Sequence, residues 1–99
     1  MEDSTRENEY VVRYKPSDHQ EEWCYFKLFE IIQTFSGITK IVSLLNIEDA
    51  KILNYEDGQT TINKIKKLYD DVPGYHLLEI ELKVIYEKEI PRFELMDMG

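Results

Sequence analysis

Residues 50–86, AKILNYEDGQTTINKIKKLYDDVPGYHLLEIELKVIY, decide the predicted fold because they read as strand, helix and strand in turn. The run from Ala50 to Tyr55 is β-prone, and Glu56-Asp57-Gly58 supplies a turn after it. Between Thr60 and Val72 the apolar residues fall on one helical face, at Ile62, Ile65, Leu68, Tyr69 and Val72. Pro73-Gly74 ends this predicted helix.

The last part of the stretch has an apolar period of two, which is typical of a strand with one buried face. Apolar residues occupy one side, at Leu78, Ile80, Leu82, Val84 and Tyr86. Charged residues occupy most of the other side, at Glu79, Glu81, Lys83 and Glu87. We therefore expect a strand that is half buried against the preceding helix.

The N-terminal part of the chain predicts a tail, a strand and a helix. Residues 1–9 are polar and acidic, and we expect a mobile tail there. Tyr10 to Lys15 alternates as a strand does, and Pro16 ends it. Ser17-Asp18-His19-Gln20 has the form of a capping box, which predicts a helix through Trp23 to Phe35. The same aromatic run also fits a strand, so the sequence leaves both structures open.

The middle of the chain favours a hairpin. Ile38 to Leu45 is rich in β-branched residues and is expected to pair with the Ala50 strand, although a second helix also fits its periodicity. The predicted order is β-α-β-β-α-β, a ferredoxin-like α+β sandwich in which two helices cover one face of an antiparallel sheet. The sequence leaves open a fifth, short edge strand over Arg92 to Leu95, after Pro91. Residues 10–99 form one domain on this reading.

Composition excludes several classes of protein. The 99 residues carry a formal charge of −8, which argues against binding to nucleic acids or anionic membranes and favours basic or neutral partners. No apolar run approaches the ~18 residues of a membrane span, and we expect a cytoplasmic protein. Cys24 is the single cysteine and is expected to be a small buried residue. His19 and His76 have no partner at metal-ligand spacing, so no metal site is expected.

Four segments make the chain similar to a BLUF domain, the flavin-binding blue-light sensor module. They are the aromatic strand with Tyr14, Gly37-Ile38-Thr39, residues 52–58 (ILNYEDG), and residues 92–99 (RFELMDMG). The resemblance implies a ferredoxin-like fold with a flavin between its helices. It also implies which residues would face that cofactor: Tyr14, Gln33, Asn54, Met96 and Met98.

The resemblance places Asn54 where that family has a glutamine. Flavin photochemistry in the family needs a side-chain amide that reaches flavin and tyrosine together, and Asn is shorter by about 1.5 Å. A hydrogen bond stretched by that amount is lost. We therefore expect no photocycle and no bound cofactor, with flavin binding as the alternative.

The function predicted from these observations is a non-enzymatic protein-interaction module. Its expected contact surfaces are the outer sheet face, through which the protein would bind a partner or itself, and the segment Arg92 to Met98. The alternatives are a flavin-binding blue-light sensor and an acidic inhibitor that occupies a basic surface of its partner. No nucleophile with a paired base is recognisable, so an enzyme is not expected. Trp23, Phe26 and Phe29 are expected in the core.

Overall fold

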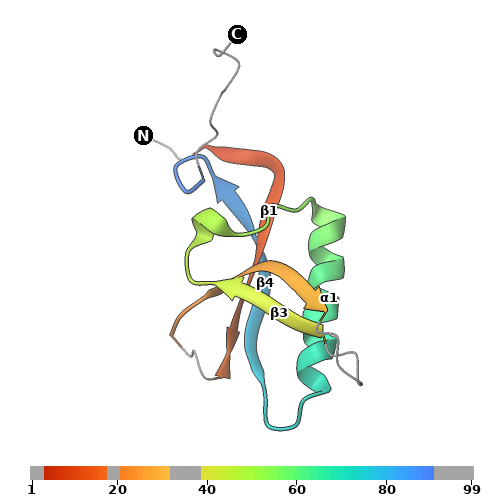
Figure 1. Ribbon diagram of the computed structural model, residues 1–99. Helices are drawn as coiled ribbons and strands as arrows, with labels where there is room; N and C mark the ends of the chain where they lie inside the picture. Colours follow the sequence, from red (N-terminus) through yellow and green to blue (C-terminus); the bar gives the residue numbers. More distant parts are fainter. Residues whose placement is uncertain (1–3, 18–20, 32–38, 91–99) are drawn as a thin grey trace.

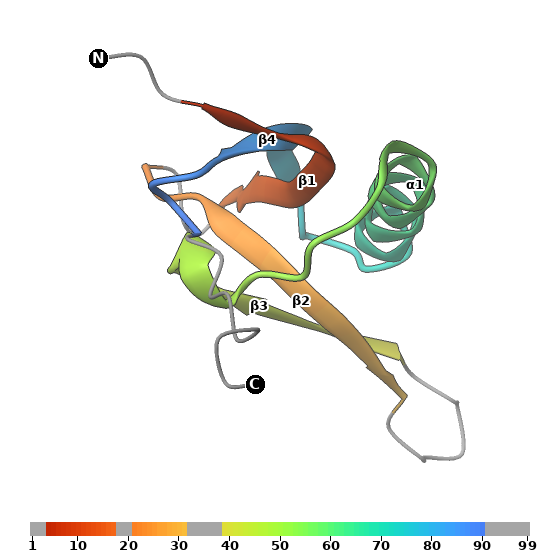
Figure 2. The same cartoon turned by 90° about the horizontal axis from the view of Figure 1, so that it is seen from above.

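The computed structural model describes residues 4–17, 21–31 and 39–90. Its elements are strands β1 (Thr5–Pro16), β2 (Cys24–Ile31) and β3 (Thr39–Leu44), the 3-10 helix η2 (Ile47–Asp49), helix α1 (Tyr55–Asp70) and strand β4 (Leu77–Tyr86). The strands form one antiparallel sheet in the order β3-β2-β1-β4. Helix α1 lies on one side of this sheet and η2 on the other (Figure 1, Figure 2). Over the described ranges the fold is therefore α+β, a helix on a four-stranded antiparallel sheet.

Strand β1 begins five residues earlier than its sequence pattern predicted. Thr5 to Glu9, which the sequence assigned to a mobile tail, belong to the sheet. The Glu87 N–H donates to the Ser4 carbonyl at 2.8 Å, and Arg6 Nη1 donates to the Ile90 carbonyl at 2.5 Å. The tail prediction is wrong for these residues because backbone pairing with the end of β4 orders a polar segment that has little apolar surface to bury.

The predicted helix from Trp23 to Phe35 is wrong over Cys24–Ile31, which forms the inner strand β2. A β-bulge between Phe26 and Leu28 resets the alternation, so that Phe26 and Phe29 both pack on the side of α1. This gives the apolar residues a three-residue spacing that imitates a helix. The strand alternative is the correct one for this segment. Residues 18–20 of the predicted capping box and residues 32–35 lie outside the described ranges.

Strand β3 confirms the extended structure predicted for Ile38 to Leu45, but its partner is different. It pairs with β2, with Phe29 opposite Ile41, instead of with Ala50 to Tyr55. The latter segment contributes one β-bridge, between Leu53 and Tyr10, before α1 begins. The observed order along the described residues is β-β-β-α-β, so the ferredoxin-like order is not confirmed.

Helix α1 confirms the predicted helix and starts five residues before Thr60. Asn54 is its N-cap, and the Asn54 side-chain oxygen accepts the Asp57 N–H at 2.7 Å. Gly58, which the sequence assigned to a turn, lies in the first part of the helix. A Cβ atom at Gly58 would lie 2.3 Å from Cδ2 of Leu82. Because Gly58 has no side chain, α1 can lie this close to β4.

Two apolar clusters lie on opposite faces of the sheet. The larger one joins α1 to the sheet through Val12, Tyr14, Cys24, Phe26, Ile62 and Ile65. The smaller one lies under η2 and the turn after β4, and its buried members are Val11, Ala50 and Ile85. Strand β4 confirms the predicted period of two at Ile80 and Leu82, which pack against the larger cluster.

The predicted edge strand from Arg92 to Leu95 lies outside the described residues. Among the helices that are described, none has the length and apolar character needed to span a membrane.

Candidate functional site

A groove opens between the C-terminal half of α1 and strand β3, on the helix side of the sheet. Its volume is about 780 Å³, within the range of binding clefts in proteins. We call it the tyrosine groove, and it is lined by Tyr14, Thr39, Lys40, Ile41, Leu68, Tyr69, Asp71, Val72 and Tyr75. Its floor comes from the sheet and one wall comes from the end of α1.

The groove exists because α1 covers only half of the sheet. The helix packs against β1 and β4, so the helix side of β2 and β3 carries no described helix of its own (Figure 2). Lys64 of α1 reaches across to β2, where its Nζ lies 4.4 Å from the ring centre of Phe29. Leu68, one turn further along α1, and Val72, just after the end of the helix, line the groove.

Three tyrosines form a continuous row along the groove. The rings of Tyr14 and Tyr69 meet edge to face with centres 6.0 Å apart, and those of Tyr69 and Tyr75 do so at 6.5 Å. Gly74 has a φ of 87°, and this left-handed turn returns the chain so that Tyr75 meets Tyr69. The row gives the groove an aromatic wall that carries hydroxyl groups.

Tyr14 is the buried anchor of this row. It is 3% exposed, and its hydroxyl is hydrogen-bonded to the Ser43 hydroxyl on β3. Burial raises the pKa of Tyr14 above its usual value, although the hydrogen bond to Ser43 lowers it in part. The phenol is therefore neutral at physiological pH. It is a fixed hydrogen-bonding group instead of an acid or base.

The rim of the groove carries charge of both signs. Lys40 on β3 and Asp71 at the end of α1 are exposed and lie on the groove's lining. A second hollow of about 390 Å³ lies beyond Tyr69 and Tyr75, between α1 and the start of β4. Its lining is more polar, with Lys66, Asp70, His76 and Glu79. The tyrosine groove is thus the larger and more apolar of these two depressions.

The residues that the BLUF resemblance singled out do not meet in the described part of the chain. Tyr10 pairs with Leu53, the neighbour of Asn54, and Tyr14 lies four residues further along β1. At about 3.3 Å per residue, roughly 13 Å separate the two positions. The Asn54 side chain caps α1 and the Tyr14 hydroxyl bonds to Ser43, so the two side chains do not converge on one ligand.

Gln33, Met96 and Met98 lie outside the described residues, as does the predicted contact segment Arg92 to Met98. The absence of a bound cofactor, with flavin binding as the alternative, stays a prediction.

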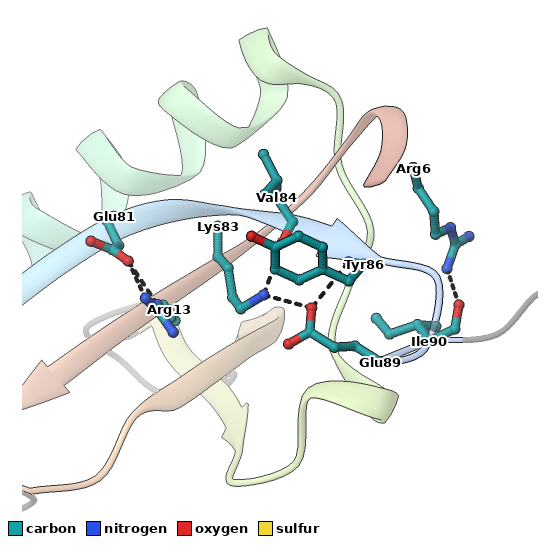
Figure 3. Close-up of polar contacts among 8 residues, drawn as sticks. All are labelled: Arg6, Arg13, Glu81, Lys83, Val84, Tyr86, Glu89 and Ile90. Carbon is teal, nitrogen blue, oxygen red and sulfur yellow. Dashed lines mark hydrogen bonds and ion pairs between the residues drawn. The ribbon is translucent and has the colours of Figure 1, made fainter. Parts of the chain in front are cut away.

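The outer face of the sheet, the predicted contact surface, is occupied by ion pairs and by the smaller apolar cluster. Arg13 Nε donates to a Glu81 carboxylate oxygen at 2.8 Å (Figure 3). Arg13 and Lys15 also lie over the ring of Trp23, with their charged groups 4.0 and 4.5 Å from its centre. The prediction that Trp23 lies in the core is therefore wrong, whereas Phe26 is buried as predicted. This face offers charge and no open apolar patch at these positions.

Sequence reasoning missed the groove although it named some of its residues. The apolar period predicts Leu68, Tyr69 and Val72 on the buried face of the helix and gives Tyr75 no role. Two features of the sequence indicate the groove. The apolar stripe of the helix ends at Val72, and Pro73-Gly74 then turns the chain so that Tyr75 comes back toward the helix.

No cluster of His, Cys, Asp or Glu that could hold a metal ion occurs among the residues that the structure describes. No family model, no curated protein and no solved structure matches the chain.

Proposed function

We propose that this chain is a non-enzymatic protein-interaction module that binds an amphipathic helix of a partner protein in the tyrosine groove. The observation that carries the proposal is the groove itself, which places aromatic and aliphatic side chains on a face of the sheet that α1 leaves open. Apolar grooves of this kind take the anchor residues of a helix.

The spacing of the sheet favours a helix as the occupant. Neighbouring strands lie about 4.8 Å apart, so the line between β2 and β3 is about 10 Å from the line between β1 and β4. Helix α1 packs over the second line, and packed helices are typically 8–10 Å apart. A partner helix over β2 and β3 would sit beside α1 and complete the layer of two helices that the ferredoxin-like prediction expected from one chain.

Charge favours a basic polar face on that helix. The rim of the groove carries both Asp71 and Lys40, so the preference comes from the whole chain, whose formal charge is −8. Lysines or arginines on the solvent side of the bound helix would be attracted by this field, which steers association more than it adds affinity. The apolar side of the helix would supply the affinity.

A designed peptide tests the proposal. The probe is a peptide of about 14 residues, roughly four turns, with leucines at helical spacing and lysines elsewhere. A peptide of the same composition with alternating leucine and lysine serves as the comparison. We expect saturable binding of the helical peptide, measured by calorimetry and by NMR shifts of the Ile41 and Leu68 methyl groups.

Two matched variants locate the binding. Val72 lines the groove at 42% exposure, and Val84 lies on β4 at 39% exposure. Val72→Lys should weaken binding by roughly tenfold or more, because a charge is then desolvated against an apolar ligand. Val84→Lys should leave the binding unchanged.

Equal binding of both peptides, or equal effects of both variants, would contradict the proposal. Binding that vanishes above ~0.1 M salt would favour the acidic-inhibitor function instead.

A further inference from the structure

An ion pair closes over the outer edge of β4 near its end (Figure 3). Lys83 Nζ lies 2.6 Å from Oε1 of Glu89 and donates to the Val84 carbonyl at 2.9 Å. The same Glu89 oxygen accepts the Tyr86 N–H at 3.0 Å. Both side chains are largely buried, with 13% and 22% of their surface exposed. We call Lys83 and Glu89 the edge clip.

The clip covers backbone groups that point away from the sheet. Strand β4 is an edge strand, and the Glu87 N–H at its end points inward, to the Ser4 carbonyl. Alternate residues of an antiparallel strand direct their backbone groups to opposite sides, so Ile80, Leu82, Val84 and Tyr86, which follow the register shift at the start of β4, face outward. The clip occupies two of these groups, on Val84 and Tyr86. Those of Ile80 and Leu82 have no hydrogen-bond partner among the described residues.

The charges on β4 select how a second copy pairs with it. A two-fold antiparallel pairing centred on Ile80 would leave the clip closed but would place Glu79 opposite Glu81 of the other copy, and facing like charges are destabilising. A pairing centred on Leu82 places Glu81 opposite Lys83 of the other copy, twice. It also places the outward groups of Val84 opposite those of Ile80. This favourable register requires the Val84 carbonyl to lose its hydrogen bond from Lys83 and Lys83 to separate from Glu89.

We propose that the β4 edge is a dimerisation surface for a second copy of this chain, centred on Leu82, and that the edge clip keeps it closed. On opening, Lys83 exchanges Glu89 of its own chain for Glu81 of the other copy. An apolar residue of β4 that a monomer exposes would then be covered, since Val84 (39% exposed) would face Ile80 of the other copy. The inference does not depend on the tyrosine groove.

The helices leave room for this dimer. Because α1 packs over the line between β1 and β4, pairing two β4 strands about 4.8 Å apart would place the two α1 axes about 10 Å apart. That is an ordinary distance for packed helices. The paired sheets would continue as one layer with α1 of both copies on the same side.

The variant Glu89→Gln tests the proposal, because an amide keeps the shape of the side chain and removes the charge that holds Lys83. The wild-type chain of 11.9 kDa should sediment as a monomer at micromolar concentration. In Glu89→Gln the dimer dissociation constant should fall roughly 10²- to 10⁴-fold, because the dimer opens two clips and each is held by a charge-assisted hydrogen bond worth a factor of roughly 10 to 100. Glu48→Gln, an exposed glutamate in η2, is the control with the same charge change and should stay monomeric.

Hydrogen exchange locates the interface. In Glu89→Gln the amides of Ile80, Leu82 and Val84 should become protected as the protein concentration rises. Adding Lys83→Glu to that variant places like charges opposite each other and should restore the monomer. Glu89→Asp, whose shorter side chain weakens the clip, is a second variant expected to shift in the same direction by less. Natively folded Glu89 variants that both stay monomeric, or a dimer without protection of β4, would overturn the proposal.

Discussion

Single residues in this protein determine how neighbouring elements pack against one another. Tyr14 joins β1 to β3 through the Ser43 hydroxyl and contacts α1 through Tyr69. Gly58 allows α1 to approach Leu82 of β4 more closely than any other residue would. Both positions are therefore sensitive to changes as small as one atom.

Replacing Tyr14 by Phe should lower the free energy of unfolding by about 1 kcal/mol at pH 7, the usual net contribution of a hydrogen bond. It should also change the response to alkali. The pKa of Tyr14 is raised in the folded state, so its contribution to stability is complete below pH ~10, the usual tyrosine pKa, and is lost as the pH rises above it. Urea unfolding should therefore show that the free energy of unfolding falls less between pH 7 and pH 10.5 in Tyr14→Phe than in the wild type. An equal loss in both proteins would contradict this assignment.

Gly58→Ala should destabilise the protein by about 1 kcal/mol, although alanine is the better helix former by a similar amount. The added methyl group collides with Leu82, so the sign should reverse once that side chain is shortened. In a Leu82→Ala background, Gly58→Ala should raise the free energy of unfolding. Thermal or urea unfolding of the four proteins in this cycle gives the answer, and additive effects would exclude the contact as the cause.

At the level of elements, the ends of α1 decide where the helix lies relative to the sheet. Asn54 starts it one residue after Leu53 pairs with Tyr10, so the position of the helix start is tied to β1. Gly74 ends the segment after the helix with a left-handed residue and returns the chain to β4. The tyrosine groove depends on both ends because they set which half of the sheet α1 covers.

Asn54→Ala should cost about 1 kcal/mol of stability, since it removes the acceptor for the Asp57 N–H at the start of α1. Asn46→Ala is a matched control: Asn46 is also an N-cap, of η2, but makes no side-chain capping hydrogen bond. It should change the free energy of unfolding by much less. Comparable losses in the two variants would mean that the cap of α1 contributes nothing specific.

At the level of the whole molecule, net charge and an incompletely covered sheet are the dominant features. The formal charge of −8 on 99 residues means that folding brings like charges together. The helix side of β2 and β3 and the outer edge of β4 are where a further helix or strand can add. The two proposals assign one occupant to each of these surfaces.

Salt should stabilise the fold. Raising NaCl from about 0.01 M to about 0.15 M shortens the screening length from about 30 Å to about 8 Å and weakens the repulsion among the excess acidic groups. The Tm measured by circular dichroism should rise over this range. The double variant Glu48→Gln, Asp49→Asn lowers the negative charge at two exposed positions and should gain less from salt. A Tm that falls with salt would mean that ion pairs such as Arg13–Glu81 outweigh the repulsion.

Much of the secondary structure was readable from local pattern. The periods of α1, β1 and β4 and the β-branched composition of β3 were present in the sequence, and the structure confirms these elements, with the starts of β1 and α1 displaced by five residues. Strand β2 was misassigned because a bulge between Phe26 and Leu28 gives it a spacing that a helix also has. The cap at Asn54 was available in the sequence, as an Asn followed by the acidic Glu56 and Asp57, and was not used.

By itself, then, the sequence determined the elements whose apolar period is local, the α+β class, the net charge and the acidic character of the surface. Only the tertiary structure decided that β3 pairs with β2, that α1 covers β1 and β4 alone, and that Tyr14, Tyr69 and Tyr75 line one groove. The physical reason is that periodicity records which side of an element is apolar. Which neighbour that side meets depends on strand pairing and loop geometry between residues far apart in the chain.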